Sequence, residues 1–203
     1  MIYDQRIVQF VCFQTLLARE AFLTRWEPFA TSFMERGIER IVLADCDAAA
    51  DSFAFISRNE WPEHRFGATF RGQLPADAGG GGVIAVQGGA FRAVSSADAD
   101  SPPVRSAADK VVALVRVVPG ALALAVEELR SLAVEHATGA GWTVFAHDPA
   151  TRGGRFDAVL EVHALTSESR SRLVRDAIAT RLAVAPYLKE SHVLAMCERL
   201  ALP

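Results

Sequence analysis

The chain has 203 residues, of which 51% are hydrophobic, enough to bury the core of one large domain or two small ones. Its formal net charge of −3 gives no electrostatic footprint for nucleic acid or for an anionic membrane. No apolar run reaches the roughly 18 residues that a membrane-spanning helix needs, and residues 1–6 lack the pattern of a secretory signal. We therefore expect a cytoplasmic protein with no nucleic-acid partner and no membrane span.

The first predicted strand, Arg6–Phe13, is apolar on both of its faces. Read at period two, Ile7 and Val11 lie on one face, and Val8 and Phe10 lie on the other. A strand with one solvated face alternates apolar and polar residues, and this stretch does not. Both faces of its sheet must therefore be covered.

A helix is predicted over residues 15–36, with Thr15 as its N-cap and an aromatic stripe made of Phe22, Trp26, Phe29 and Phe33. Pro28 lies inside this helix and should kink it or split it in two. The other elements of this half are strands at 38–45, 51–58 and 83–94 and a short helix at 61–71. Gly88 and Gly89 predict a bulge in the last of these strands.

Residues 95–109 are rich in Ser, Ala, Asp and Pro and show no apolar periodicity, which predicts an exposed linker. The same pattern then returns, with strands at 110–118, 142–147, 155–164 and 185–198 and helices at 121–138 and 166–182. The order β-α-β-β-α-β therefore occurs twice. We predict one unit over residues 1–94 and a second over residues 110–203.

This organisation resembles the dimeric α+β barrel superfamily, in which ferredoxin-like units pack sheet against sheet with their helices outside. The resemblance implies an α+β fold in which two antiparallel sheets form the barrel, here from two units of one chain. Trp61, His64 and Phe66 resemble the tryptophan- and histidine-bearing second helix that is common in the superfamily. Residues 164–183 contain neither residue type, so the second unit departs from this pattern. We expect the barrel to close within the chain and the chain to form a homodimer.

The resemblance also implies an enzyme without a cofactor, namely an oxygenase, isomerase or decarboxylase acting on a small aromatic or polyketide-like molecule. His64 is the predicted general base, because the ordinary pKa of imidazole is close to neutral. Trp26 and Trp61 are predicted to form an aromatic wall for a flat substrate, and Arg58 to hold an anionic group. In the alternative interpretation, His64 lies on the surface and both tryptophans belong to the core.

Polar residues on strands that should face between the sheets are the other substrate-binding candidates. Arg116 interrupts an apolar run, and Glu161 and His163 share one strand face. If that face lines the barrel, these residues form a polar patch in an apolar pocket, as small-molecule sites do. A buried Glu161 would then be paired with an arginine, because an isolated buried charge is too costly. The alternative is that these strand ends reach solvent.

No metal or cofactor is expected. The cysteines are odd in number and have no metal-ligand spacing, which predicts inert buried thiols in a reducing compartment for Cys12, Cys46 and Cys197. No tight ligand pair is formed by the dispersed histidines His147, His163 and His192. One branch of the superfamily holds haem through a histidine, and nothing flanking His136, His147 or His163 resembles its motif.

Two other functional classes stay open. The same barrel could hold a small apolar or aromatic ligand without changing it, as a binding or stress-associated protein. It could also be filled by its own side chains, as a purely structural module. A ligand recovered unchanged from the purified protein favours the first class, and a barrel without a cavity favours the second.

Overall fold

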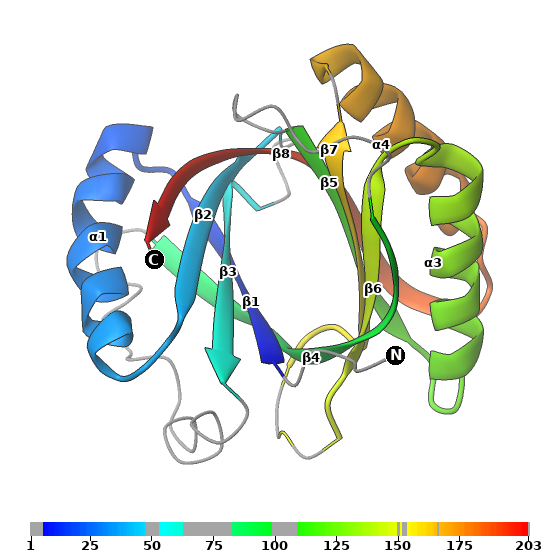
Figure 1. The fold of residues 1–203 in the computed structure, drawn as a ribbon, viewed down its shortest axis with the longest axis horizontal. Coiled ribbons are helices and arrows are strands. Elements are labelled where there is room, and N and C mark those ends of the chain that lie inside the picture. Colours follow the sequence, from blue (N-terminus) through cyan, green and yellow to red (C-terminus); the bar gives the residue numbers. More distant parts are fainter. Residues whose placement is uncertain are drawn as a thin grey trace.

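The computed structural model describes residues 6–47, 53–62, 83–98, 109–149, 151, 154–165 and 167–202. Within these ranges, eight strands form one closed antiparallel barrel in the order β1-β3-β2-β8-β5-β7-β6-β4 (Figure 1). The elements are β1 (Arg6–Thr15), α1 (Arg19–Glu35), β2 (Arg40–Cys46), β3 (Phe55–Pro62), β4 (Val83–Ala97), β5 (Asp109–Val117), α3 (Leu122–His136), β6 (Gly141–His147), β7 (Ala158–Leu165), α4 (Glu168–Ala183) and β8 (Leu188–Leu202).

Two long strands join the two halves of the barrel. β4 pairs with β1 through residues 83–91 and with β6 through residues 91–97. β8 pairs with β5 through residues 188–197 and with β2 through residues 196–202. The two ferredoxin-like sheets therefore face each other within one chain, with α1 outside the first sheet and α3 and α4 outside the second (Figure 1). The predicted α+β barrel is confirmed, and it closes within the chain.

Both faces of β1 are buried, as its sequence predicts. On the outer face, Ile7 and Val11 belong to the core beneath α1, together with Trp26. On the inner face, Val8 and Phe10 belong to the core between the sheets. The second sheet repeats this arrangement, because alternate residues of β5 pack under α3 and α4 or face the interior.

The interior of the barrel is a packed aromatic core. Phe10 lies edge-on to Phe91 and to Phe145, with ring centroids 5.7 and 5.9 Å apart. Phe53 and Phe156 make a further edge-on contact at 6.2 Å. These rings are almost completely buried. Because close-packed interiors leave few voids, the space between the two sheets is filled largely by the chain itself.

The structure corrects the predicted boundaries in the first half. Trp61 lies in β3 rather than in a helix over 61–71, because it continues the ladder opposite Ile7 and fills the core beneath α1. Thr15 is not the N-cap of α1, because it extends β1 and pairs with Val83. Pro28 lies within α1 without ending it, since α1 is continuous from Arg19 to Glu35.

Other boundaries differ by a few residues. The register of β1 and β4 shifts beside Gly88 and Gly89, as expected for the predicted bulge. β4 continues to Ala97, so the strand takes in the first three residues of the predicted linker, 95–109. β7 begins at Ala158 rather than at residue 155. No helix in the described part of the chain is long and apolar enough to cross a membrane.

Candidate functional site

β3 divides the predicted site residues between the two faces of the first sheet. Arg58 points to the interior of the barrel, as Ile56 does on the same strand face. Trp61 points outward into the core beneath α1. Since alternate residues of a strand face opposite sides, Arg58 and Trp61 cannot line one pocket, and two separate groups of polar residues result. His64 lies outside the described residues.

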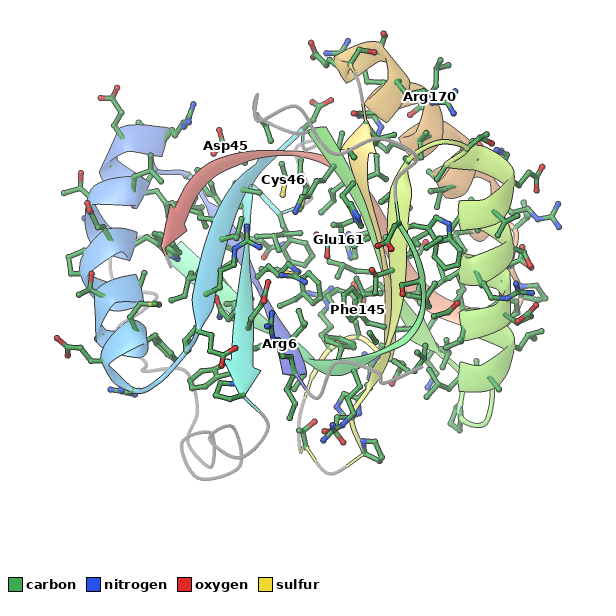
Figure 2. The ribbon with its side chains drawn as sticks, viewed as in Figure 1. Arg6, Asp45, Cys46, Phe145, Glu161 and Arg170 are labelled. Atoms are coloured by element: carbon green, nitrogen blue, oxygen red, sulfur yellow. The ribbon has the colours of Figure 1, made fainter. Side chains whose placement is uncertain are left out.

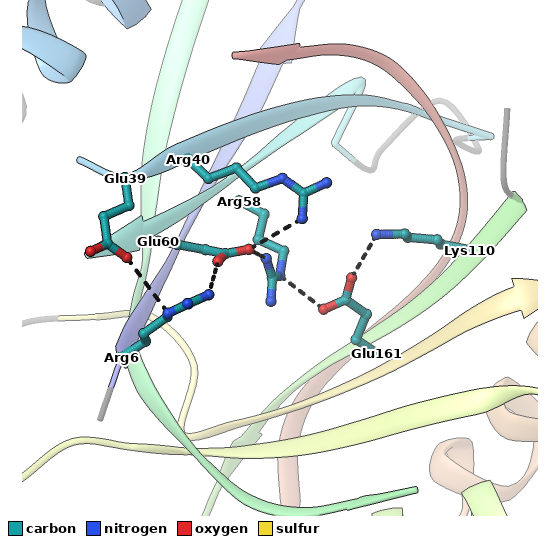
Figure 3. Close-up of polar contacts among 7 residues, drawn as sticks. All are labelled: Arg6, Glu39, Arg40, Arg58, Glu60, Lys110 and Glu161. Atoms are coloured by element: carbon teal, nitrogen blue, oxygen red, sulfur yellow. Dashed lines mark hydrogen bonds and ion pairs between the residues drawn. The ribbon is translucent and has the colours of Figure 1, made fainter. Parts of the chain in front are cut away.

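The first group is an interior charge cluster, made of Arg6, Glu39, Arg40, Arg58, Glu60, Lys110 and Glu161 (Figure 3). Its centre joins the two sheets: Arg58 Nε donates to Glu161 Oε2 at 3.0 Å, and Lys110 Nζ donates to Glu161 Oε1 at 3.1 Å. The Arg58 guanidinium also lies over the Phe145 ring, 6.0 Å from its centroid. Figure 2 shows Glu161 and Phe145 in the space between the sheets.

The cluster runs from this buried centre to the rim of the barrel. Glu60 binds Arg58, accepts a hydrogen bond from Arg6 Nη1 at 3.3 Å, and forms an ion pair with Arg40 at 3.6 Å. Arg6 in turn pairs with Glu39. Side-chain exposure rises from 5% at Glu161 to 51% at Arg6. Every carboxylate of the cluster is therefore paired with a cation.

Pairing and burial shift the pKa values at the centre of the cluster. Burial alone would raise the pKa of Glu161, but the Arg58 and Lys110 charges outweigh it and lower that pKa to about 2. Burial would lower the pKa of Arg58, but Glu161 and Glu60 raise it. Arg58 and Glu161 are therefore both ionised near neutral pH, and their ion pair links the two sheets.

His163 lies beside this centre, and Arg116 does not. Burial lowers the pKa of His163, so its imidazole is neutral near pH 7. Its ring lies over Gly141, where an added Cβ would be 2.8 Å from Cδ2 and would overlap Nε2. Arg116 is exposed at the opposite end of β5 from Lys110, where it pairs in register with Glu190. Of the predicted patch of Arg116, Glu161 and His163, the structure therefore brings Glu161 and His163 together without Arg116, and the neighbouring arginine is Arg58, predicted to act beside His64 and the tryptophans.

The other two histidines on barrel strands sit in filled surroundings. His192 lies 5.0 Å from Phe53, between ring centroids, and its Nε2 is 2.7 Å from Glu190 Oε1. His147 lies edge-on to Phe91 at 6.2 Å. In the described ranges, no three His, Cys, Asp or Glu side chains converge as metal ligands.

The second group is an outer polar chain beneath α1, made of Gln9, Ser57, Asn59 and Trp61. Ser57 Oγ donates to Asn59 Oδ1 at 2.7 Å, and Asn59 Nδ2 donates to Gln9 Oε1 at 3.2 Å. Trp61 Nε1 also donates to Gln9 Oε1 at 3.2 Å. Gln9 is 0% exposed, and its Nε2 has no hydrogen-bond partner among the residues that the structure describes. The outer polar chain therefore ends at Gln9 Nε2, a buried amide donor without an acceptor among the described residues.

Aromatic side chains from α1 and from the first sheet lie in the same layer as the outer polar chain. Phe22 stacks on Phe55 with centroids 4.1 Å apart, and Phe33 meets Trp61 edge-on at 6.3 Å. A hollow of about 10 Å³ lies in this layer, lined by Val11, Phe13, Trp26, Ala30, Phe33, Ile41, Ser57 and Asn59. Such a volume holds about one water molecule. The predicted residues Trp26 and Trp61 thus lie in one aromatic layer, together with neutral polar groups.

A larger groove of about 510 Å³ lies on the surface where β8 crosses between the sheets, lined by Asp45, Cys46, Asp47, Glu168, Ser171, Arg172, Ala195, Met196 and Cys197. Figure 2 shows Asp45 and Cys46 beside this crossing. Arg19, Arg175 and Arg172 bind three of its carboxylates, those of Asp45, Asp47 and Glu168. Burial raises the pKa of the Cys46 thiol, as it does for Cys12 in the barrel interior. The groove therefore presents paired charges and, at Cys46, a protonated thiol.

The sequence interpretation did not single out Gln9, Asn59, Glu60 or Lys110. Gln9 is the one polar residue among the alternate positions Ile7, Gln9 and Val11 of an otherwise apolar strand face. A polar side chain in that pattern is a signal, because a buried amide needs partners. Its partners come from β3, and their positions depend on the register of β1 with β3.

Comparison with known proteins supports the fold. No family model matches the chain, and no curated protein matches it. Among solved structures, an anthrone oxidase-like protein aligns with a TM-score of 0.64 and 11% identity over 98% of this chain and 93% of that one. A protein from Fusobacterium nucleatum subsp. nucleatum, proposed to be a monooxygenase, gives 0.59 and 10% identity over 98% and 95%. A chlorite dismutase variant from Candidatus Nitrospira defluvii gives 0.53 and 10% identity over 98% and 93%.

Proposed function

Since the chain has the fold of the dimeric α+β barrel proteins, with both ferredoxin-like units in one chain, we propose that it is a cofactor-independent oxygenase of a small aromatic or polyketide-like molecule. The observation that carries the proposal is the layer beneath α1, where neutral hydrogen-bonding groups lie among aromatic rings. Small-molecule sites are mostly apolar with a few placed polar groups, and this layer has that composition. The substrate would enter between α1 and β3.

The aromatic residues of this layer and the neighbouring His64 would have different roles. Trp26 and Trp61 would flank the flat ring of the substrate and keep water away from it. His64, two residues after the end of β3, is proposed as the base that removes a proton from the substrate. The resulting carbanion would reduce dioxygen directly. With anthrone as substrate, one dioxygen is consumed, and anthraquinone and one water are released.

The interior charge cluster would support this site from behind. Arg58 and Glu60 hold β3 on its inner face through ion pairs, while Ser57, Asn59 and Trp61 project from its outer face. A strand fixed on one side keeps its other side chains in place, which is how a rigid scaffold positions a site. The predicted substrate-binding roles of Arg58, Glu161 and His163 are thereby replaced in our proposal by a positioning role.

Oxygen uptake tests the oxygenase proposal. The purified chain, with a chelator and no added flavin, should consume dioxygen and form anthraquinone when anthrone is added. Trp26→Phe should lower kcat/KM at least about tenfold, which corresponds to about 1.4 kcal/mol. Trp142→Phe is the matched control, because Trp142 is buried under the helices of the other half. No uptake with anthrone or with a panel of phenols and naphthols, or equal losses in the two variants, contradicts the proposal.

A non-catalytic binding protein is the second candidate. It is favoured by the hollow beneath α1, whose described lining residues include no titratable side chain. Native mass spectrometry of the freshly purified chain tests it, since a co-purified aromatic molecule recovered unchanged after exposure to dioxygen supports binding without chemistry. The homodimer is also a proposal, and light scattering after size-exclusion chromatography measures it.

A further inference from the structure

The outer polar chain has a fixed direction of hydrogen bonding. Ser57 Oγ donates to Asn59 Oδ1, so the other end of the Asn59 amide, Nδ2, is a donor. Asn59 Nδ2 and Trp61 Nε1 then both donate to the same atom of Gln9, at 3.2 Å each. An indole nitrogen is only ever a donor, so the Gln9 atom that receives it must be the oxygen. The orientation of the Gln9 amide is therefore set by its partners.

The direction of these hydrogen bonds determines what Gln9 Nε2, at the end of the outer polar chain, can bind. Gln9 Nε2 carries two N–H groups in a site where the Gln9 side chain is completely buried. A buried donor without a partner costs about 1–3 kcal/mol, so such groups are normally satisfied by a protein group, a water or a ligand. The complement of two N–H groups is an oxygen with free lone pairs. A cation or a second N–H donor would be repelled.

We propose that Gln9 is the specificity-determining residue of this site, and that its Nε2 donates to a carbonyl or enolate oxygen of a flat aromatic ligand. The inference deepens the proposed function and rests on it for the position of the ligand. The surrounding side chains accept the ring, since Trp26, Phe33 and Trp61 are aromatic and buried. Enolate oxygen binds amide N–H groups more strongly than neutral carbonyl oxygen does, so Gln9 would also favour the deprotonated form of the substrate.

Room for such a ligand would have to come from a movement of α1. The hollow of about 10 Å³ is lined by Ser57 and Asn59 of the outer polar chain and not by Gln9, and it holds one water, so a ring would reach Gln9 only when α1 moves away from the sheet. Ala18 at the N-cap of α1 makes no side-chain hydrogen bond, and Pro28 removes one backbone donor from the middle of the helix. By contrast, Ser167 caps α4 by accepting from the Arg170 backbone N–H.

Two probes of the same shape test the proposal. The ketone 1-tetralone and the hydrocarbon tetralin differ at one position, where only the ketone carries an acceptor oxygen. Isothermal titration calorimetry with the full chain should show the ketone binding about five- to tenfold more tightly. In Gln9→Glu this preference should disappear while the affinity for tetralin stays the same, because an ionised glutamate keeps the acceptor for Asn59 and Trp61 and lacks the donor. Measurement at pH 9 keeps the glutamate ionised.

Gln14→Glu is the matched control, since it makes the same change on the same strand, outside the outer polar chain. It should keep the ketone preference. In a 15N-labelled sample, the side-chain amide signal that Gln9→Glu removes should shift on adding 1-tetralone and stay in place on adding tetralin. Circular dichroism and thermal unfolding confirm that each variant is folded.

Three results overturn the proposal: an unchanged ketone preference in Gln9→Glu, equal binding of the two probes by the unmodified chain, or no binding of either probe. The last result means that the hollow holds only water. None of these measurements involves turnover. If the chain consumes no dioxygen but shows a ketone preference that depends on Gln9, the oxygenase proposal is contradicted and the binding site at Gln9 is supported.

Discussion

Arg58 Nε donates to Glu161 Oε2 at 3.0 Å, although the two residues are 103 positions apart in the sequence. Arg58 belongs to the sheet beneath α1 and Glu161 to the sheet beneath α3 and α4. Their side chains are 18% and 5% exposed, so water screens the pair weakly. The pair therefore joins the two halves across the interior, and separating the halves would leave Arg58 with Glu60 alone and Glu161 with Lys110 alone.

Replacing Glu161 by glutamine should destabilise the fold. The change leaves Arg58 and Lys110 without the carboxylate that both of them bind, and breaking a buried pair in this way costs about 3–5 kcal/mol. Urea unfolding followed by circular dichroism measures the free energy of unfolding. The control is Glu127→Gln, which breaks the exposed Glu127–Arg130 pair on α3 and should leave stability nearly unchanged. Equal effects of the two changes contradict the role of the interior pair.

Acid should destabilise the chain in two steps. The pKa of His163 is lowered by burial, so the fold favours neutral imidazole, and this stabilisation is complete above about pH 6.5 and declines below it. The pKa of Glu161 is lowered from 4.5 to about 2, so its stabilisation is complete above pH 4.5 and is lost as the pH falls toward 2. At about 1.4 kcal/mol for each pKa unit, the second step amounts to about 3 kcal/mol.

Variants separate these two steps. His163→Gln should flatten the dependence of the unfolding free energy on pH just below 6.5 and leave the dependence below pH 4.5 in place. Glu161→Gln should flatten the dependence below pH 4.5 and leave the dependence just below pH 6.5 in place. Equilibrium unfolding at half-unit pH intervals provides the curves, and a first step that persists in His163→Gln would assign it to another group.

Gly141→Ala should destabilise the fold through His163. The added Cβ would overlap the imidazole, and the ring would have to move from its place beside Glu161. Overpacking of this kind costs about 1–3 kcal/mol. The check is a double-mutant cycle: in a His163→Ala background the same glycine change should cost far less, because the obstructing ring is gone. A cost that is independent of His163 would locate the strain in the backbone.

A better N-cap on α1 should stabilise the fold and slow the association of a ligand. Ala18 has extended backbone angles suited to a cap, and Ala18→Ser should add about 1 kcal/mol. Ser167→Ala is the converse change on α4, where it removes an existing cap and should cost a similar amount. Thermal unfolding measures both. If α1 moves to admit the ring, Ala18→Ser should also slow the association of 1-tetralone, while Ser167→Ala should leave that rate unchanged.

The sequence alone determined the architecture of this chain. The apolar residues on both faces of Arg6–Phe13 require two covering layers, and the repeated order of strands and helices supplies them. These patterns are local, so they can be read without coordinates. The sequence misplaced Trp61 at the start of a helix over 61–71, because nothing local shows that β3 continues as far as its pairing with β1 requires.

Only the tertiary structure decided which polar residues meet. Arg58 and Trp61 are three positions apart, yet they face opposite sides of a sheet, while Arg58 and Glu161 come from different halves and touch. The partners of Gln9 are likewise set by the pairing of β1 with β3. Contacts of this kind depend on strand register and on how the barrel closes, and a shift of one residue would reverse every face. The physical reason is that burial is encoded along the chain, whereas the pairing of buried polar groups exists only once the sheets are assembled.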